Sequence, residues 1–132
     1  MSGETDLSRL LAGMRPSLRP GTYVFATVAG GAVPAGLVPA MSFHEVEGTT
    51  LIVPEADAAQ AGLAGIFPCR WITLAVHSSL EAVGFLAAVT ARLAAAGIAV
   101  NAVSAFHHDH LFVPVARADD AMALLRDLAG AP

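Results

Sequence analysis

The pattern of apolar and polar residues in the second half of the chain predicts a strand, a helix and a hairpin, in that order. Residues 71–76 form a short apolar run rich in β-branched and aromatic side chains, which is typical of a buried strand. The SSLE run at 78–81 has the spacing of a capping box and predicts that a helix begins there. Good helix formers continue to Ala96, and Gly97 stands where a helix commonly ends.

Two further apolar segments and a last helix complete this half. Residues 98–106 and 111–115 are predicted strands, and the polar run 107–110 joins them. Residues 118–128 have the composition of a helix. The resulting order, β-α-β-β-α, is most of a ferredoxin-like βαββαβ unit, so the predicted fold class is α+β.

The first half begins with a predicted amphipathic helix. Apolar residues in 6–14 recur at the spacing of one helix face, and Arg15-Pro16 and Pro20-Gly21 predict its end and a turn. Residues 22–28 are a predicted strand. Residues 29–40 contain three glycines and two prolines, so we expect them to form a loop.

A predicted hairpin and a short helix follow this loop. Residues 42–46 and 49–53 are the strands of the hairpin, and residues 54–63 form the helix. Glycines and Pro68 then predict a connection into the second half of the chain. The LIVP run at 51–54 matches the LFVP run at 111–114. Two related α+β units would explain this repeat, and so would chance similarity in an alanine-rich chain.

Composition predicts a self-associating protein with an acidic surface. The chain has 132 residues, of which 55% are hydrophobic and 14% charged, with a mean hydropathy of +0.63. So apolar a chain is expected to bury surface in a dimer or higher homo-oligomer. The net charge of −4 and the pI near 5.6 argue against nucleic acid or an anionic membrane surface as partners.

Targeting signals and cysteine usage favour a cytoplasmic location. No apolar run reaches the roughly 18–20 residues that a membrane-spanning helix needs. The first ten residues lack the basic segment of a secretory signal. The single cysteine, Cys69, cannot form an internal disulfide, which fits a reducing compartment.

Several segments resemble the ACT domain, a small βαββαβ module that binds amino acids and other small metabolites. In the second half they are ITLAV, HSSLEAVG, AAAGIAVNAVSA, HDHLFVPV and ADDAMALLRDL. The chain as a whole is similar to small bacterial ACT-domain proteins through MRPSLRPGTYVFATV, FHEVEGTTLIVPE, ITLAVHSSLEAVG and HHDHLFVPV.

This resemblance implies tandem ferredoxin-like, ACT-type units with antiparallel sheets and helices on one face. Residues 1–68 would form a degenerate ACT-like unit and residues 69–132 an ACT domain. The second unit departs from the family pattern, because no strand follows its last helix. Its fourth strand is therefore expected to be absent or donated, with residues 22–28 as the candidate donor.

The segment that follows the predicted strand at 71–76 is the leading candidate for ligand binding. A helix N-terminus leaves N–H groups unpaired and suits a carboxylate. In ACT domains the resembling segment commonly contacts ligand through its backbone. Here Ser78 and Ser79 could add hydroxyl contacts, and Glu81 could receive an amino group. The alternative is that Ser78 and Glu81 only cap the helix. The expected ligand-binding residues are His77, Ser78, Ser79, Leu80, Glu81, Ala82, Val83 and Asn101.

Two residues of the predicted helix need a packing explanation. Gly84 costs about 1 kcal/mol relative to alanine inside a helix, so we expect a close approach there. Phe85 lies on a stripe between Glu81 and Arg92. Either a second buried face or a covering loop would account for the aromatic ring.

The polar run 107–110 has the composition of a metal site. If His108-Asp109 were a two-residue turn, His107 and His110 would point to one face and could hold a divalent metal with Asp109. No further ligand motif accompanies them, and an exposed hairpin tip is the more frequent explanation. We therefore predict no metal and no cofactor.

Catalysis has little support in the sequence. Arg70 could lower the pKa of the Cys69 thiol, but a structural cysteine is the favoured interpretation. No GxSxG or phosphate-binding motif is present. The leading hypothesis is a non-enzymatic module that binds an amino acid or similar metabolite. The alternatives are an interaction or oligomerisation module that uses a surface around Phe85, and a metal-dependent enzyme that uses His107, Asp109 and His110.

Overall fold

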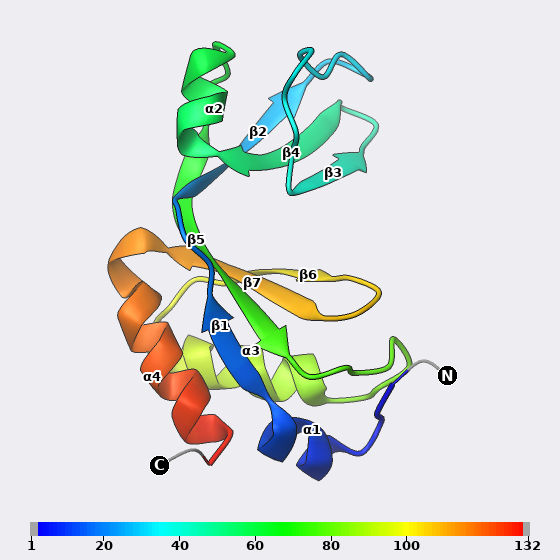
Figure 1. Ribbon diagram of the computed structural model, residues 1–132, viewed down its shortest axis with the longest axis vertical. Helices are drawn as coiled ribbons and strands as arrows, with labels where there is room; N and C mark the ends of the chain where they lie inside the picture. Colours follow the sequence, from blue (N-terminus) through cyan, green and yellow to red (C-terminus); the bar gives the residue numbers. More distant parts are fainter. Residues whose placement is uncertain (1–2, 131–132) are drawn as a thin grey trace. The chain divides into compact units, whose positions relative to one another are not determined.

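A computed structural model describes residues 3–130 of the chain (Figure 1). The chain divides into two units. Gly21–Cys69 forms the central unit, while the stretches up to Pro20 and from Arg70 onward form the terminal unit. Strand β5 (Ile66–Ala75) begins in the central unit and ends in the terminal unit.

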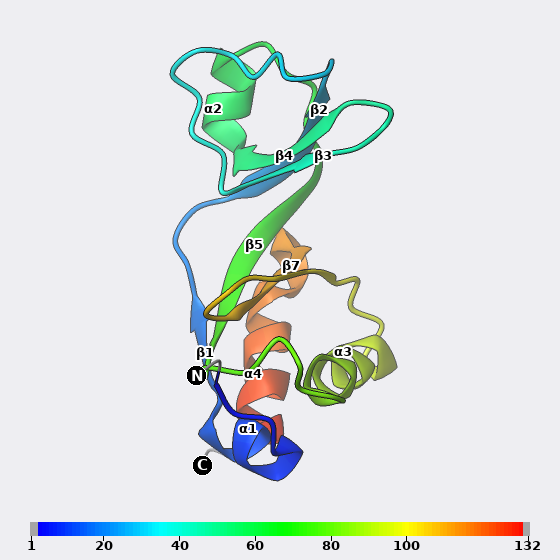
Figure 2. The same cartoon turned by 90° about the vertical axis from the view of Figure 1, so that its right-hand side faces the viewer.

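The terminal unit is a four-stranded sheet with helices. Its strands are β1 (Arg15–Leu18), the later part of β5, β6 (Asn101–Ser104) and β7 (Asp109–Pro114), in the order β1-β5-β7-β6. Helices α1 (Leu7–Gly13), α3 (Phe85–Ala95) and α4 (Ala118–Leu128) accompany them, with a 3₁₀ turn at Val115–Arg117. Figure 2 shows α3 and α4 on the same side of β5 and β7.

Strand β1 was not predicted from the sequence, which indicated only the end of the first helix at Arg15-Pro16 and a turn at Pro20-Gly21. Arg15 lies opposite Ala75 and Leu18 lies opposite Ile72 in an antiparallel pair. β1 thus occupies the edge where a complete βαββαβ unit has its last strand, so the donor is Arg15–Leu18 and not residues 22–28. Pro16 concealed this strand in the sequence, although proline is tolerated on an edge strand.

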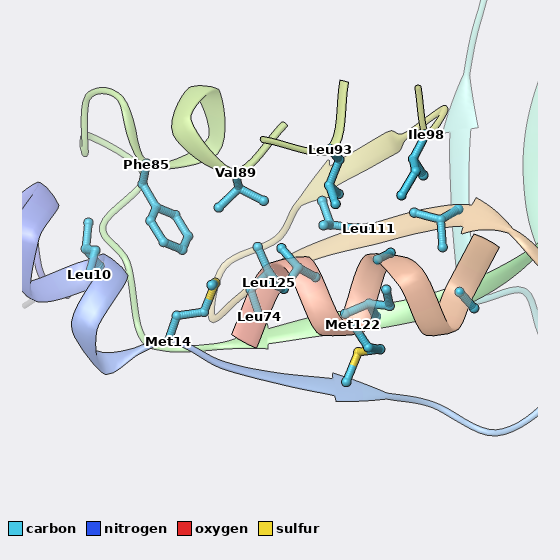
Figure 3. Packing of buried hydrophobic residues seen from close by; sticks show 14 residues of the cluster. Leu10, Met14, Leu74, Phe85, Val89, Leu93, Ile98, Leu111, Met122 and Leu125 are labelled. Atoms are coloured by element: carbon cyan, nitrogen blue, oxygen red, sulfur yellow. The ribbon is translucent and has the colours of Figure 1, made fainter. Parts of the chain in front are cut away.

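The core of the terminal unit lies between this sheet and its helices (Figure 3). Fourteen buried residues form one cluster. Phe85 is only 2% exposed and points into this core near Leu10 and Met14. Because α3 begins at Phe85, the predicted stripe from Glu81 through Phe85 does not exist. The members of the cluster are Leu10, Met14, Ile72, Leu74, Phe85, Val89, Leu93, Ile98, Leu111, Val113, Ala118, Ala121, Met122 and Leu125.

The central unit has the same kind of sheet with fewer helices. Its strands are β2 (Tyr23–Val28), β3 (Met41–His44), β4 (Thr49–Pro54) and the start of β5, in the order β3-β4-β2-β5. Helix α2 (Glu55–Gln60) follows β4. The loop predicted at 29–40 takes the place of a first helix. Its cluster of buried residues packed against one another is small and has the members Val24, Leu51, Val53 and Ala58.

The start of β5 departs from the prediction because of a bulge. The strand begins at Ile66, not at position 71, and it contains Pro68. Its pairing with β2 shifts register between Tyr23 and Phe25. Phe67 has a φ of 55°, and its ring meets the Phe25 ring edge-on at 5.9 Å between centroids. Such a bulge interrupts the regular strand pairing, so the alternating pattern of the sequence does not indicate the first part of this strand.

The sequence repeat corresponds to a structural repeat. The LIVP and LFVP runs end β4 and β7, which share one burial pattern along their six residues. Each strand ends in proline, and helical residues follow directly. The two units therefore use related strand-to-helix segments.

Candidate functional site

A pocket of about 180 Å³ lies in the terminal unit. The loop after β5, the start of α3 and the β6–β7 hairpin form its walls. Five polar side chains are buried among the described residues, and three of them, Ser78, Ser79 and Asp109, line this pocket. The lining residues are Ser78, Ser79, Leu80, Ala82, Phe85, Leu86, Ser104, Ala105 and Asp109.

Asp109 is the only buried acidic residue in the described part of the chain, with 7% of its surface exposed. Its Oδ1 accepts a hydrogen bond from Ser104 Oγ at 2.6 Å, and its Oδ2 accepts one from Ser78 Oγ at 3.2 Å. Residues 3–130 contain no ion pair that involves Asp109. A buried carboxylate is costly without such donors, and it attracts a cation that enters the same cavity.

The loop between β5 and α3 is held by its own backbone and by Ser79. The Ser79 Oγ accepts a hydrogen bond from Glu81 N at 3.0 Å, and the Ser79 carbonyl accepts one from Ala82 N at 3.0 Å. The capping-box prediction is therefore wrong, because the Ser78 hydroxyl donates to Asp109 and the helix begins only after Gly84. Gly84 has a φ of 95°, a left-handed conformation that a helix cannot continue through.

The N-terminus of α3 borders the pocket. The N-cap residue, Gly84, has no side chain that could accept from the first-turn N–H groups, and this turn contains no acidic residue. Phe85 and Leu86 belong to this turn and line the pocket. An eleven-residue helix with an uncapped first turn favours a negative group at this point.

The predicted ligand segment is only partly at the pocket. Ser78, Ser79, Leu80 and Ala82 line it, whereas His77, Glu81 and Val83 are exposed and do not. Asn101 is exposed and lies on the opposite face of β6 from Ser104. Five further residues line the pocket outside the predicted ligand segment, namely Phe85, Leu86, Ser104, Ala105 and Asp109. They come to the pocket through the helix start at Phe85 and through the cross-strand pairing of Ser104 with Asp109.

The histidine-rich hairpin does not have the geometry of the metal hypothesis. Its loop has four residues, closed by a hydrogen bond from Ala105 N to the His108 carbonyl at 3.0 Å. Asp109 faces the pocket, while His110 lies on the other face and accepts from Trp71 Nε1 at 3.0 Å. No group of three potential metal ligands comes together within residues 3–130. Burial and the nearby His108 lower the pKa of His110.

Cys69 is buried and takes no part in the pocket. Its thiol donates a weak hydrogen bond to the Tyr23 carbonyl at 3.3 Å. Burial raises the pKa of the Cys69 thiol to about 11. The suggestion that Arg70 activates this thiol is therefore wrong, since the protonated form is favoured at neutral pH.

Comparison with known families explains this architecture. Two sequence models of the ACT domain match the chain, one over residues 2–70 and the other over residues 66–127. The chain belongs to the ACT-domain family. ACT domains are commonly regulatory modules that bind small molecules. A search of curated protein sequences found no match.

Solved structures agree with the assignment to the ACT-domain family. A Vibrio cholerae protein of unknown function, described as a possible transport protein, is 42% identical over 93% of this chain and 95% of its own, with a TM-score of 0.85. An Agrobacterium tumefaciens protein is 18% identical, with a TM-score of 0.75 and coverage of 88% and 89%. The regulatory subunit of aspartate kinase from Thermus thermophilus is 12% identical, with a TM-score of 0.66 and coverage of 86% and 95%. The last two share the fold.

Among the described residues, none of the helices is both long enough and apolar enough to cross a bilayer.

Proposed function

We propose that this ACT-domain protein binds a small amino acid in the Asp109 pocket and acts as a non-enzymatic regulatory module. The observation that carries the proposal is the buried Asp109 carboxylate, which has two hydroxyl donors and no cationic partner in residues 3–130. An ammonium group is the ligand group that would complete this arrangement. The uncapped first turn of α3 would receive the ligand carboxylate.

The size of the pocket limits the ligand. A volume of about 180 Å³ corresponds to roughly six water molecules. This space suits an amino acid with a short side chain. Ala82 and Ala105 line the pocket and leave room for that side chain, while Leu80 offers it an apolar contact.

A thermal-shift screen against the twenty amino acids at millimolar concentration tests the proposal. A ligand at a hundredfold excess over its Kd stabilises the folded state by about 2.7 kcal/mol. We expect one or a few small amino acids to raise the melting temperature by several degrees. Asp109→Asn should remove most of this shift, because it neutralises the carboxylate but keeps its shape.

The matched control is Asp119→Asn, which makes the same change on an exposed residue of α4. This variant should keep the full response. A flat panel for the wild-type protein, or an equal response in Asp109→Asn, would contradict the proposal.

An interaction module is the second candidate function, and exposed apolar residues near the pocket favour it. Leu80 is 64%, Val83 85% and Phe106 69% exposed. The prediction that this surface surrounds Phe85 is wrong, because the Phe85 side chain is buried. We propose self-association through this surface in the cytoplasm. Size-exclusion chromatography with light scattering tests it, since Val83→Ser and Phe106→Ser together should reduce the measured mass.

A further inference from the structure

The segment of residues 3–6, which we name the N-terminal strap, pairs with the pocket loop. Glu4 and Ser78 form a single parallel β-bridge. Glu4 N donates to the His77 carbonyl at 2.9 Å, and the Glu4 carbonyl accepts from Ser79 N at 2.9 Å. The strap therefore satisfies the backbone N–H of Ser79, while the hydroxyl and carbonyl of the same residue accept the hydrogen bonds that shape the loop.

The close approach of the strap depends on Gly3. Its φ is 96°, and a Cβ at this position would lie 2.5 Å from the His77 carbonyl oxygen. The same atom would be 3.0 Å from Ser79 N. These are backbone atoms within the bridge itself, so a side chain at Gly3 is incompatible with the docked strap.

The other end of the strap is fixed to the core. Asp6 caps α1 by accepting a hydrogen bond from Arg9 N at 3.0 Å, and Leu10 of this helix is fully buried. The Glu4 carboxylate turns back and accepts from Thr5 N at 3.0 Å and from Asp6 N at 3.1 Å. The strap thus connects a core helix directly to the pocket loop.

None of the strap residues lines the pocket, so any effect on a ligand must pass through the loop. We infer that the N-terminal strap switches the pocket between a formed and an unformed state by docking on and leaving Ser79. In the docked state the loop holds Ser78 against Asp109. In the undocked state Ser79 N loses its partner, and residues 79–82 gain freedom. The control of ligand binding rests on the proposed function, whereas the control of the loop does not.

Amide hydrogen exchange of the pocket loop, measured in two matched glycine variants, tests whether the strap holds the loop. Gly3→Ala and Gly21→Ala introduce the same side chain at nearly the same φ, 96° and 92°, but Gly21 has nothing within 4 Å of the new atom. We expect the amides of Ser79, Glu81 and Ala82 to exchange on the order of tenfold faster in Gly3→Ala. In Gly21→Ala their exchange should equal that of the wild-type protein. Glu4→Pro removes the Glu4 N–H donor and should reproduce the result.

The core amides decide whether the strap acts locally. Leu125 in α4 should keep its protection in both Gly3→Ala and Glu4→Pro. Unchanged exchange at Ser79 would overturn the inference. Equal loss of protection at Leu125 would also overturn it, because the strap would then be inseparable from the global fold.

Repeating the amino-acid screen on Gly3→Ala tests the link to the ligand. A weakened response in Gly3→Ala but not in Gly21→Ala supports the switch, and a full response together with a freed loop overturns it. If no amino acid stabilises the wild-type protein while the loop is freed in Gly3→Ala, the proposed function fails and the control of the loop stands.

Discussion

Thr49 in the central unit and Asp109 in the terminal unit occupy equivalent places. Each is buried and is the first residue of the strand that carries the sequence repeat. Thr49 donates its hydroxyl hydrogen to the Gly30 carbonyl and lies 3.1 Å from Nδ1 of its cross-strand neighbour His44. Asp109 receives hydrogen bonds from its own neighbour, Ser104, and from Ser78.

The difference between these positions shows that the same point of the fold can be occupied by a polar group bonded to the backbone, as in the central unit, or by a charged group beside a pocket, as in the terminal unit. In the central unit a neutral hydroxyl is satisfied by the loop backbone, and no charge is left for a ligand. In the terminal unit the carboxylate accepts from two hydroxyl groups and has no other hydrogen-bond donor within residues 3–130, and a pocket remains beside it. The charge at this position therefore distinguishes the two units, in addition to the loop that replaces a first helix in the central unit.

The largest effect on stability is expected from shortening a core leucine at equivalent positions of the two units, Leu111 and Leu51. Leu111→Ala should lower the free energy of unfolding by about 4–5 kcal/mol and Leu51→Ala by about 2–3 kcal/mol. Leu111 belongs to a cluster of fourteen buried residues, whereas Leu51 belongs to one of four. A larger cavity should persist around Leu111. Urea unfolding of both variants measures the difference, and a larger loss for Leu51→Ala would contradict it.

Exchanging the residues at the equivalent positions should have the next largest effect. Thr49→Asp buries a carboxylate against the Gly30 carbonyl, so we expect a loss of about 3 kcal/mol in unfolding free energy. Asp109→Thr should cost only about 1 kcal/mol, because Ser78 and Ser104 can bond to the new hydroxyl. Urea unfolding at pH 7 tests both, and equal costs would show that the two sites do not differ in charge tolerance.

A glycine beside the central sheet should show a smaller effect. A Cβ at Gly65 would lie 2.6 Å from the Val24 side chain, so Gly65→Ala should cost about 2 kcal/mol. Gly62→Ala is the control, because its φ is 72° and nothing lies within 4 Å of the new atom. It should cost about 1 kcal/mol from backbone strain alone. Thermal unfolding measures both, and equal losses would mean that the approach to Val24 is not tight.

The smallest effect concerns the pH dependence of the terminal unit. Burial, and to a smaller extent the nearby His108, lowers the pKa of His110. This histidine therefore binds a proton more readily in the unfolded chain than in the folded one. Stability should therefore fall as the pH drops below the ordinary histidine pKa, about 6.5. His110→Gln should reduce this fall. Urea unfolding between pH 7 and pH 5 tests it, and an unchanged slope in the variant would contradict the assignment.

Local patterns were sufficient for the elements that carry an uninterrupted period. The helices at Leu7–Gly13 and Ala118–Leu128 and the repeated strands were predicted from spacing and composition. The edge strand at Arg15–Leu18 was missed because its proline indicates a helix end, while its partner β5 lies more than fifty residues later in the chain.

The pocket could be predicted only in part, since long-range contacts decide its shape. The serines of the SSLE run were expected at the site, but as helix caps or direct ligand contacts. Ser78 instead bonds to Asp109, and this contact replaces the local capping box. The strap on Ser79 is equally invisible to periodicity, because a single β-bridge leaves no pattern in the sequence.

Calorimetric titration of the amino acid that gives the largest thermal shift tests the role of Asp109 most directly. Saturable binding at one site per chain is expected for the wild-type protein and for Asp119→Asn, with an affinity at least about tenfold lower for Asp109→Asn. Equal affinity for the wild-type protein and Asp109→Asn, or the absence of saturable heat for any amino acid, would contradict a ligand site built around this carboxylate.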